Sequence, residues 1–172
     1  PMTNTQVETI IMTDGREIHF QEYWVRHRGT LPVDEVKRRW ETPPMATPEV
    51  LSAINSAEAV IIGPSNPITS ILPILECGGV VEALESVPVV AVSPFIGDAP
   101  VSGPAAALMR AKGLAPDSAA TRDLYARFLD FFVQDTRDTK GVPGAARMDT
   151  LMNREGIDES LAAGILSLVR GM

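Results

Sequence analysis

Three short apolar segments constrain the fold of this chain more than any other feature. They span residues 59–62, 87–92 and 131–134 and are rich in Val, Ile and Phe. Helical patterns separate them and follow the last one. Short buried strands that alternate with helices are typical of a parallel sheet covered on both faces. The sequence therefore predicts an α/β fold.

Helix signals support this prediction. Thr47 is a good helix cap, and Pro48 suits the first helical position. Further helices are predicted from about residue 69, where Pro73 is tolerated in the first turn, and at 104–112, 118–129 and 157–170. The expected architecture is a Rossmann-like, mostly parallel sheet with helices on both faces.

The N-terminal region predicts a separate β-hairpin. Strand-like residues 7–12 and 16–25 flank the turn sequence Thr13-Asp14-Gly15. Alternation would place Trp24 on the same face of the second strand as Phe20. Residues 26–48 are rich in charges and prolines, which indicates a long connection or a flap with a possible short helix at 33–40.

Composition narrows the class of protein. The 172 residues, 45% of them hydrophobic, suffice for one domain, and a net charge of −7 argues against a nucleic-acid partner. The single cysteine, Cys77, excludes an internal disulfide. There is no signal peptide, and the longest uncharged run, residues 59–75, is interrupted by Gly63 and three prolines. We therefore expect a cytoplasmic protein without membrane contact. The opening Pro1-Met2-Thr3 indicates a piece of a larger domain.

Two strand-to-helix junctions are candidate binding sites. The first is Gly63-Pro64-Ser65-Asn66-Pro67-Ile68-Thr69-Ser70, and the second combines Ser93-Pro94 with Val101-Ser102-Gly103-Pro104. Free backbone N–H groups at helix starts favour phosphate, and parallel strands bring both junctions to one rim, where a diphosphate could bridge them. The alternative is ordinary capping and turn chemistry.

Other residues with suitable chemistry are more ambiguous. Asp135 and Asp138 follow the third strand and could hold a divalent cation or accept a proton, or could form a solvated strand exit. Trp24 could stack on a planar ligand or pack in the hairpin core. His19 and His27 lack metal-site spacing.

Four segments together resemble the 2-phospho-L-lactate transferase family of deazaflavin coenzyme biosynthesis. They are His19-Phe20-Gln21-Glu22-Tyr23-Trp24-Val25, Ile62-Gly63-Pro64-Ser65-Asn66-Pro67-Ile68-Thr69-Ser70-Ile71, Val90-Ala91-Val92-Ser93-Pro94 and Val101-Ser102-Gly103-Pro104-Ala105. Their order and spacing also fit, from Pro1 to about Met152. Ala106-Ala107 replace a Gly-Lys pair common in the family, which removes a potential phosphate contact.

The resemblance implies a reaction and its participants. A phospholactyl or phosphoenolpyruvyl group would pass from a guanosine diphosphate conjugate to the ribityl hydroxyl of a hydroxy-deazaflavin, releasing GMP on the route to coenzyme F-420. Mg²⁺ and a homodimer are expected. We expect the diphosphate or the acceptor tail to contact residues of both junctions, with Trp24 stacking on the acceptor. The candidate binding residues are Gly63, Pro64, Ser65, Asn66, Pro67, Thr69, Ser70, Ser93, Pro94, Ser102, Gly103, Asp135 and Asp138.

The family resemblance also leaves alternatives open. Family members are about twice as long and begin with a glycine-rich half followed by aspartates associated with the metal, which this chain lacks. We therefore expect residues 1–172 to be the C-terminal portion, inactive by itself. A non-catalytic regulator that binds nucleotide sugars, like the related gluconeogenesis-factor family, is the second hypothesis. A structural remnant held by a partner chain is the third.

Overall fold

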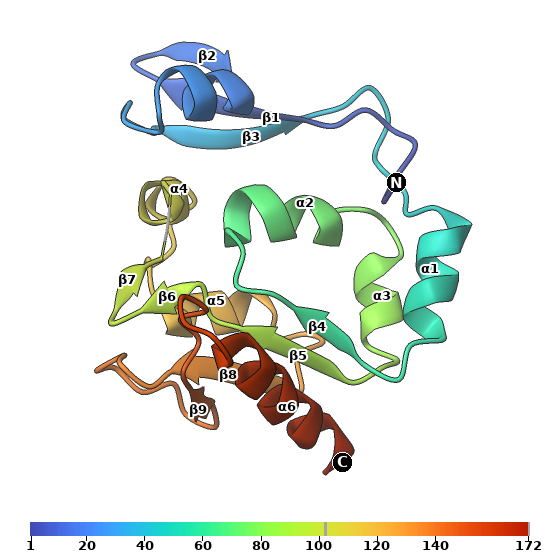
Figure 1. The fold of residues 1–172 in the computed structure, drawn as a ribbon. Helices are drawn as coiled ribbons and strands as arrows, with labels where there is room; N and C mark the ends of the chain where they lie inside the picture. Colours follow the sequence, from blue (N-terminus) through green and yellow to red (C-terminus); the bar gives the residue numbers. More distant parts are fainter. Residues whose placement is uncertain (102, 172) are drawn as a thin grey trace.

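A helical layer separates two β-sheets of different type in the computed structural model, which describes residues 1–101 and 103–171 (Figure 1). The three-stranded antiparallel sheet at the top has the order β2-β1-β3, and the four-stranded parallel sheet has the order β4-β5-β8-β9. The strands are β1 (Glu8–Thr13), β2 (Arg16–His19), β3 (Glu35–Arg39), β4 (Val60–Ile62), β5 (Val89–Val92), β8 (Phe131–Asp135) and β9 (Ala146–Met148). The predicted α/β class and N-terminal hairpin are confirmed.

Helices cover both faces of the parallel sheet, as predicted. The α-helices are α1 (Pro48–Asn55), α2 (Leu72–Leu75), α3 (Val80–Leu84), α4 (Ala105–Ala111), α5 (Ser118–Leu124) and α6 (Ile157–Arg170). In the central strand, Val89 and Ala91 pack into a core that contains residues of α3 and the end of α5. Val90 and Val92 point the other way, into a core completed by α6. This two-sided burial explains why β5 reads as an unbroken apolar run.

The first junction enters its helix slightly earlier than predicted. A π-helix, η2 (Pro67–Ile71), begins at the second proline of the junction and continues directly into α2. Pro73 is the second residue of α2 and lies where the π-helical segment that starts at Pro67 changes to an α-helix. Thr47 caps α1 by accepting from the N–H of Val50 at 3.4 Å, as predicted.

The prediction of a strand through residue 25 is wrong. The turn is correct, because Asp14 and Gly15 both have positive φ angles, as a type I′ hairpin requires. However, β2 ends at His19, and a second π-helix, η1 (Glu22–Arg26), follows. The ring of Tyr23 is buried and its hydroxyl donates to the Gly29 carbonyl at 2.9 Å. Burying Tyr23 turns Trp24 outward.

The predicted short helix at 33–40 is also wrong, because these residues form β3. This strand pairs antiparallel with β1, and Val36 lies opposite Ile11. Val36 and the side chain of Arg38 are both buried, two positions apart. Arg38 points inward but is charged and has a charged residue on each side. The alternation of apolar and polar residues that would have predicted a strand is therefore hidden.

Two further strand pairings lie where the sequence predicted no strand. The β6 (Phe95–Ile96) and β7 (Ala99–Pro100) strands form a small hairpin after β5, and β9 pairs parallel with β8. These segments are short, so their periodicity carries little signal. No helix in the described part of the chain is both long enough and apolar enough to cross a bilayer.

A separate apolar cluster joins the antiparallel sheet to the helical layer. Ile11, Tyr23 and Val36 pack with Ile68 of η2 and with Leu108 and Met109 of α4; Phe95 completes the cluster. The first junction, through Ile68, is therefore part of the packing between the antiparallel sheet and the helical layer.

Candidate functional site

A cavity of about 270 Å³ lies where the two predicted junctions and η1 meet. Its lining consists of Phe20, Trp24, Pro64, Ser65, Asn66, Thr69, Ser70, Pro94, Val101, Gly103, Pro104 and Ala105. The prediction that both junctions open on one rim is confirmed. Gly63, Pro67, Ser93, Asp135 and Asp138 are outside this lining. Ser102, also predicted for the site, lies outside the described residues.

Asn66 occupies the helix start that was expected to bind phosphate. Its side-chain oxygen Oδ1 accepts from the N–H of Ile68 at 3.0 Å and from that of Thr69 at 3.3 Å. Pro67, which precedes them, has no N–H to offer. The prediction of free backbone N–H groups at this junction is therefore wrong, because the asparagine itself takes the orphan donors as an N-cap.

Trp24 forms an aromatic wall of the cavity rather than part of the hairpin core. The residue is 42% exposed. A Cβ added to Gly29 would come within 3.0 Å of the indole, and one added to Gly103 within 3.3 Å. Both glycines also have φ near +67°, a conformation that favours glycine. The indole is thus cradled by two glycines from different loops.

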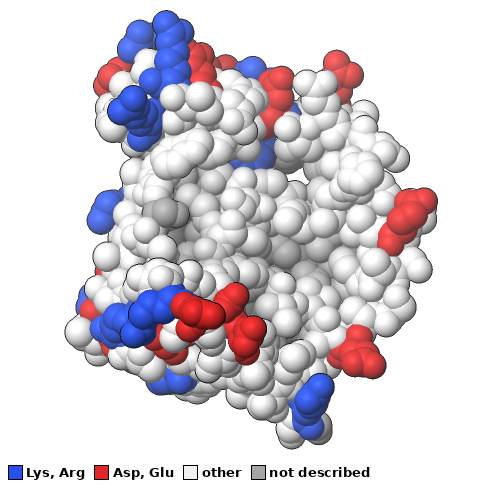
Figure 2. Space-filling view, in the orientation of Figure 1, with Lys and Arg blue, Asp and Glu red and all other residues white. Residues whose placement is uncertain are grey.

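The described lining of the cavity holds hydroxyl, amide, proline and aromatic groups but no formally charged side chain. On the face shown in Figure 2, Lys, Arg, Asp and Glu lie mainly toward the margin, and uncharged residues cover most of the centre. Such a lining suits an uncharged ligand with a planar ring and hydroxyl groups, because stacking and hydrogen bonding supply the contacts.

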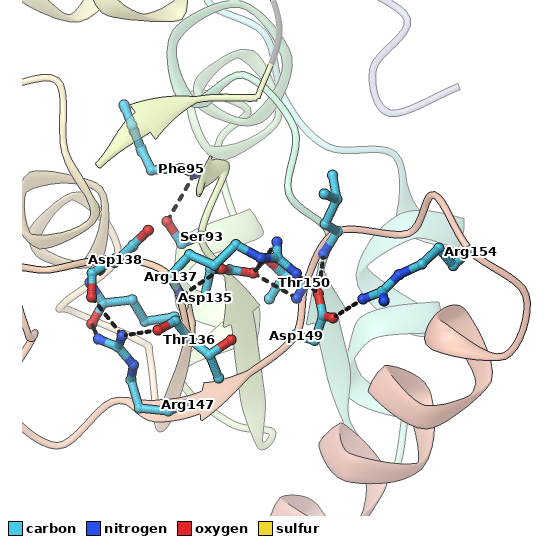
Figure 3. Close-up of polar contacts among 12 residues, drawn as sticks. Ser93, Phe95, Asp135, Thr136, Arg137, Asp138, Arg147, Asp149, Thr150 and Arg154 are labelled. Carbon is cyan, nitrogen blue, oxygen red and sulfur yellow. Dashed lines mark hydrogen bonds and ion pairs between the residues drawn. The ribbon is translucent and has the colours of Figure 1, made fainter. Parts of the chain in front are cut away.

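Asp135 is fully buried at the end of β8 and has protein partners at both carboxylate oxygens. Oδ1 accepts from the N–H of Arg137 at 2.8 Å, and Oδ2 accepts from the N–H and the hydroxyl of Thr150, each at 2.8 Å. The Arg137 guanidinium lies 3.3 Å from Oδ2 and also bonds Asp149 (Figure 3). Hydrogen bonding to Arg137 lowers the pKa of Asp149. This network fastens the end of β8 to the segment after β9.

Asp138 is also buried, so the solvated strand exit considered for this pair is wrong. Its Oδ2 accepts from the Ser118 hydroxyl at 2.9 Å and from the Gln134 amide at 3.0 Å. Ser118 in turn lies 2.7 Å from the hydroxyl of Ser93. Ser93, Asp138 and Asp135 thus belong to the internal scaffold next to the cavity.

Gln134 and Arg147 complete this scaffold, although little in the sequence pattern indicates their roles. Gln134 is buried in β8 and accepts from the Val142 N–H at 2.9 Å and from Arg147 at 3.1 Å. Arg147 also donates to the carbonyls of Thr136 and Asp138 (Figure 3). A glutamine within a strand of apolar residues was the one available signal, because a buried amide needs partners for all its polar atoms.

The expected Mg²⁺ does not fit the ligands present in the described residues. They contain no group of three or more His, Cys, Asp or Glu side chains arranged to hold a metal. Magnesium needs oxygen ligands in nearly octahedral geometry, whereas the oxygens of Asp135 and Asp138 accept from backbone, hydroxyl, amide or guanidinium donors of this chain. Neither aspartate is therefore assigned to a metal.

Comparison with known proteins gives a consistent result. A sequence profile described as 2-phospho-L-lactate transferase CofD matches residues 1–156. The chain is 53% identical to a 2-phospho-L-lactate transferase of Methanospirillum hungatei over 97% of its length, and 51% identical to that of Methanocorpusculum labreanum, also over 97%. It spans 56% of the length of each of these relatives.

Solved structures support the fold. Two structures of a Bacillus halodurans protein, described in one of them as a UPF0052 family member, resemble the chain at 16% and 14% identity. Their TM-scores are 0.53 and 0.59, covering 83% and 96% of this chain and 43% and 60% of the other. At this identity the likeness establishes architecture alone.

Proposed function

The chain belongs to the 2-phospho-L-lactate transferase family, and from this we propose that it carries the acceptor-binding part of an enzyme of coenzyme F-420 biosynthesis. That enzyme would transfer a phospholactyl or phosphoenolpyruvyl group from a guanosine diphosphate conjugate to a hydroxy-deazaflavin, with release of GMP. The observation that carries the proposal is the single cavity built from both junctions and Trp24.

The chemistry of the cavity favours the acceptor over the diphosphate. A diphosphate needs cations or free N–H donors, whereas the described lining is uncharged and Asn66 occupies the N–H groups at the η2 start. A deazaflavin has a planar ring and a ribityl chain of hydroxyl groups. Trp24 would stack on the ring, and Ser65, Thr69 and Ser70 would hydrogen-bond the chain.

The size of the cavity is compatible with a single small substrate. Pockets for small ligands usually measure about 300–1,000 Å³, so a cavity of about 270 Å³ has room for one substrate or part of one. In transfer to an alcohol, the contribution of such a site is orientation, since a correctly held hydroxyl meets the phosphorus without the entropy cost of a free encounter. The expected donor, Mg²⁺ and homodimer belong to the proposal for the whole protein.

The test measures acceptor binding and transfer separately. We expect the 172-residue chain to bind hydroxy-deazaflavin, and quenching of tryptophan fluorescence measures this binding. The same chain should not catalyse transfer. In the full-length protein, Thr69→Val should weaken acceptor binding and transfer about tenfold, the cost of one lost hydrogen bond in a buried site. Chromatography of the phospholactyl product and of GMP measures the transfer.

Thr30→Val is the matched control, because the Thr30 hydroxyl donates to the His27 carbonyl and does not line the cavity. Equal activity of Thr69→Val and the wild type would remove Thr69 from the site. Binding of a nucleotide sugar without binding of the deazaflavin would favour the regulator hypothesis. Strong binding of Mg²⁺ and guanine nucleotide by residues 1–172 in calorimetry would contradict the acceptor assignment.

A further inference from the structure

The lining residues from the second junction, Pro94, Val101, Gly103, Pro104 and Ala105, form what we call the second wall of the cavity. This wall continues into the β6–β7 hairpin, whose tip has two residues with positive φ angles. Gly97 and Asp98 have φ angles of +62° and +63°, as a type I′ turn requires. Pro94 and Val101, on either side of the hairpin, both line the cavity and are joined by a hydrogen bond of 3.1 Å. The position of this hairpin therefore fixes the position of the wall.

Reciprocal hydrogen bonds fasten the hairpin tip to the loop after β8. The carboxylate of Asp98 accepts from the N–H of Thr139 at 3.1 Å, from the N–H of Lys140 at 3.3 Å and from the Thr139 hydroxyl. In return, the N–H of Asp98 donates to Oδ1 of Asp138 at 3.2 Å. The Thr139 hydrogen bond is the largest influence that lowers the pKa of Asp98.

A second, buried chain of hydrogen bonds starts from the same Asp138. Because Ser118 gives its only hydroxyl proton to Asp138, it accepts from Ser93, and Ser93 in turn accepts from the N–H of Phe95 at 3.1 Å. Asp138 is thus connected to both ends of β6: to the tip through Asp98 and to the base through Ser93. These residues do not line the cavity.

We propose that Asp98, Thr139, Asp138, Ser118 and Ser93 form a latch that positions the second wall of the cavity and so sets the affinity for its ligand. The latch acts through Pro94 and Val101 and touches no ligand itself. Its members are positioning residues. Only the identity of the ligand rests on the proposed function, so the movement of the wall can be measured without any ligand.

The experiment uses Trp24 as the reporter, because its indole lies against Gly103 of the same wall. In a Trp40→Phe background, which leaves Trp24 as the single tryptophan of this chain, we compare Asp98→Ala, Thr139→Val and Thr139→Ser. Hydrogen exchange of the Val101 amide and acrylamide quenching of Trp24 measure how firmly the second wall is held in position. Asp98→Ala and Thr139→Val should speed exchange about tenfold, as expected when a hydrogen bond to a charged group is lost. Thr139→Ser, which keeps the hydroxyl, should have the wild-type exchange rate at Val101.

Asp130→Ala is the matched control for Asp98→Ala, because it likewise removes a carboxylate that accepts from a backbone N–H. Asp130 also bonds a distant backbone N–H, that of Val89 at 2.8 Å, but at the start of β5, far along the strand from the cavity. A general loosening of the sheet would show in this variant as well, whereas the latch predicts wild-type exchange at Val101.

The outcomes separate the latch from the proposed function. Folded Asp98→Ala and Thr139→Val proteins with unchanged exchange and quenching would overturn the latch, whatever binds in the cavity. Faster exchange in a protein that does not bind deazaflavin would support the latch and refute the acceptor assignment. If both hold, the variants should raise the KM for the acceptor about tenfold and leave kcat within about twofold, because the wall alters ligand binding and not the reacting groups.

Discussion

At the scale of single residues, Asn66 serves two roles with different atoms. Its Oδ1 caps η2 by accepting from Ile68 and Thr69, and the residue also lines the cavity. The amide NH₂ can therefore serve a ligand while the oxygen holds the helix. Substitutions that change one atom at a time distinguish these roles.

We predict that Asn66→Ala and Asn66→Asp weaken acceptor binding to a similar degree but differ in stability. Alanine removes the cap and should lower the free energy of unfolding by about 1 kcal/mol, whereas aspartate keeps an acceptor oxygen. Urea unfolding measures the first effect and fluorescence titration the second. Wild-type affinity in Asn66→Asp would show that the NH₂ group does not contact the ligand.

Asp135 leads to the opposite prediction, a loss of stability without a change in binding. In Asp135→Asn an NH₂ group would face the donors of Thr150 and Arg137, so we expect a loss of roughly 2–4 kcal/mol in urea unfolding. Asp149→Asn, at a partly exposed carboxylate of the same network, should cost clearly less than Asp135→Asn, because solvent screens its ion pairs. Acceptor affinity should stay within about twofold, because Asp135 does not line the cavity.

At the scale of elements, the sequence predicted the long or strongly apolar helices and strands. It missed the elements whose conformation is decided by tertiary contacts with other parts of the chain. Strands β4, β5 and β8 and helix α6 follow directly from apolar runs and helical period. β3 was missed because Arg38 occupies an inward position that its partners, Glu76 and the Ile68 carbonyl, make tolerable. η1 replaced the end of a strand because tertiary burial of Tyr23 outweighed local alternation.

The same limit applies to the site. Convergence of the two junctions could be predicted, since strand direction alone brings them to one rim. The capping role of Asn66 was not recognised, although asparagine before Pro67 is a cap signal in itself. The burial of Asp135 and Asp138 depends on Thr150, Ser118 and Gln134, which are distant in sequence or unremarkable in type.

The hairpin tip gives a prediction for acidic solution. Because the pKa of Asp98 is lowered in the folded protein, its contribution to stability is present above the ordinary pKa of the carboxyl group and is lost as the pH falls through the lowered value. The charged neighbours of this carboxylate are Lys140, Asp138 and Asp117. Exchange of the Val101 amide, corrected for its intrinsic pH dependence, should accelerate on acidification, and Asp98→Asn should show less of this acceleration.

At the scale of the whole molecule, Arg38 connects the antiparallel sheet to η2, whose Thr69 and Ser70 line the cavity. Its guanidinium bonds Glu76 at 2.9 Å and the carbonyl of Ile68 in η2, and the side chain is 4% exposed. Its Nη1 has no hydrogen-bond partner within the described residues. The upper sheet and η2 therefore hold each other in position.

We expect Arg38→Lys to destabilise the protein although it keeps the charge. A lysine ammonium cannot reproduce the planar fork that reaches both Glu76 and Ile68, so the loss should be about 2 kcal/mol. Arg39→Lys is the adjacent control, since the Arg39 side chain is exposed and its ion pairs with Glu8 and Glu17 should change stability by less than about 1 kcal/mol. Equal losses in the two variants in urea unfolding would contradict the bridging role of Arg38.

The uncharged lining of the cavity has a consequence for how the protein responds to its solvent. Dissolved salt screens attraction between charges but leaves stacking and neutral hydrogen bonds nearly untouched. Affinity for the deazaflavin should therefore be almost the same at about 0.05 M and about 0.5 M sodium chloride, where the screening length differs about threefold. A polyanion held in the same place would instead be released as the ionic strength rises.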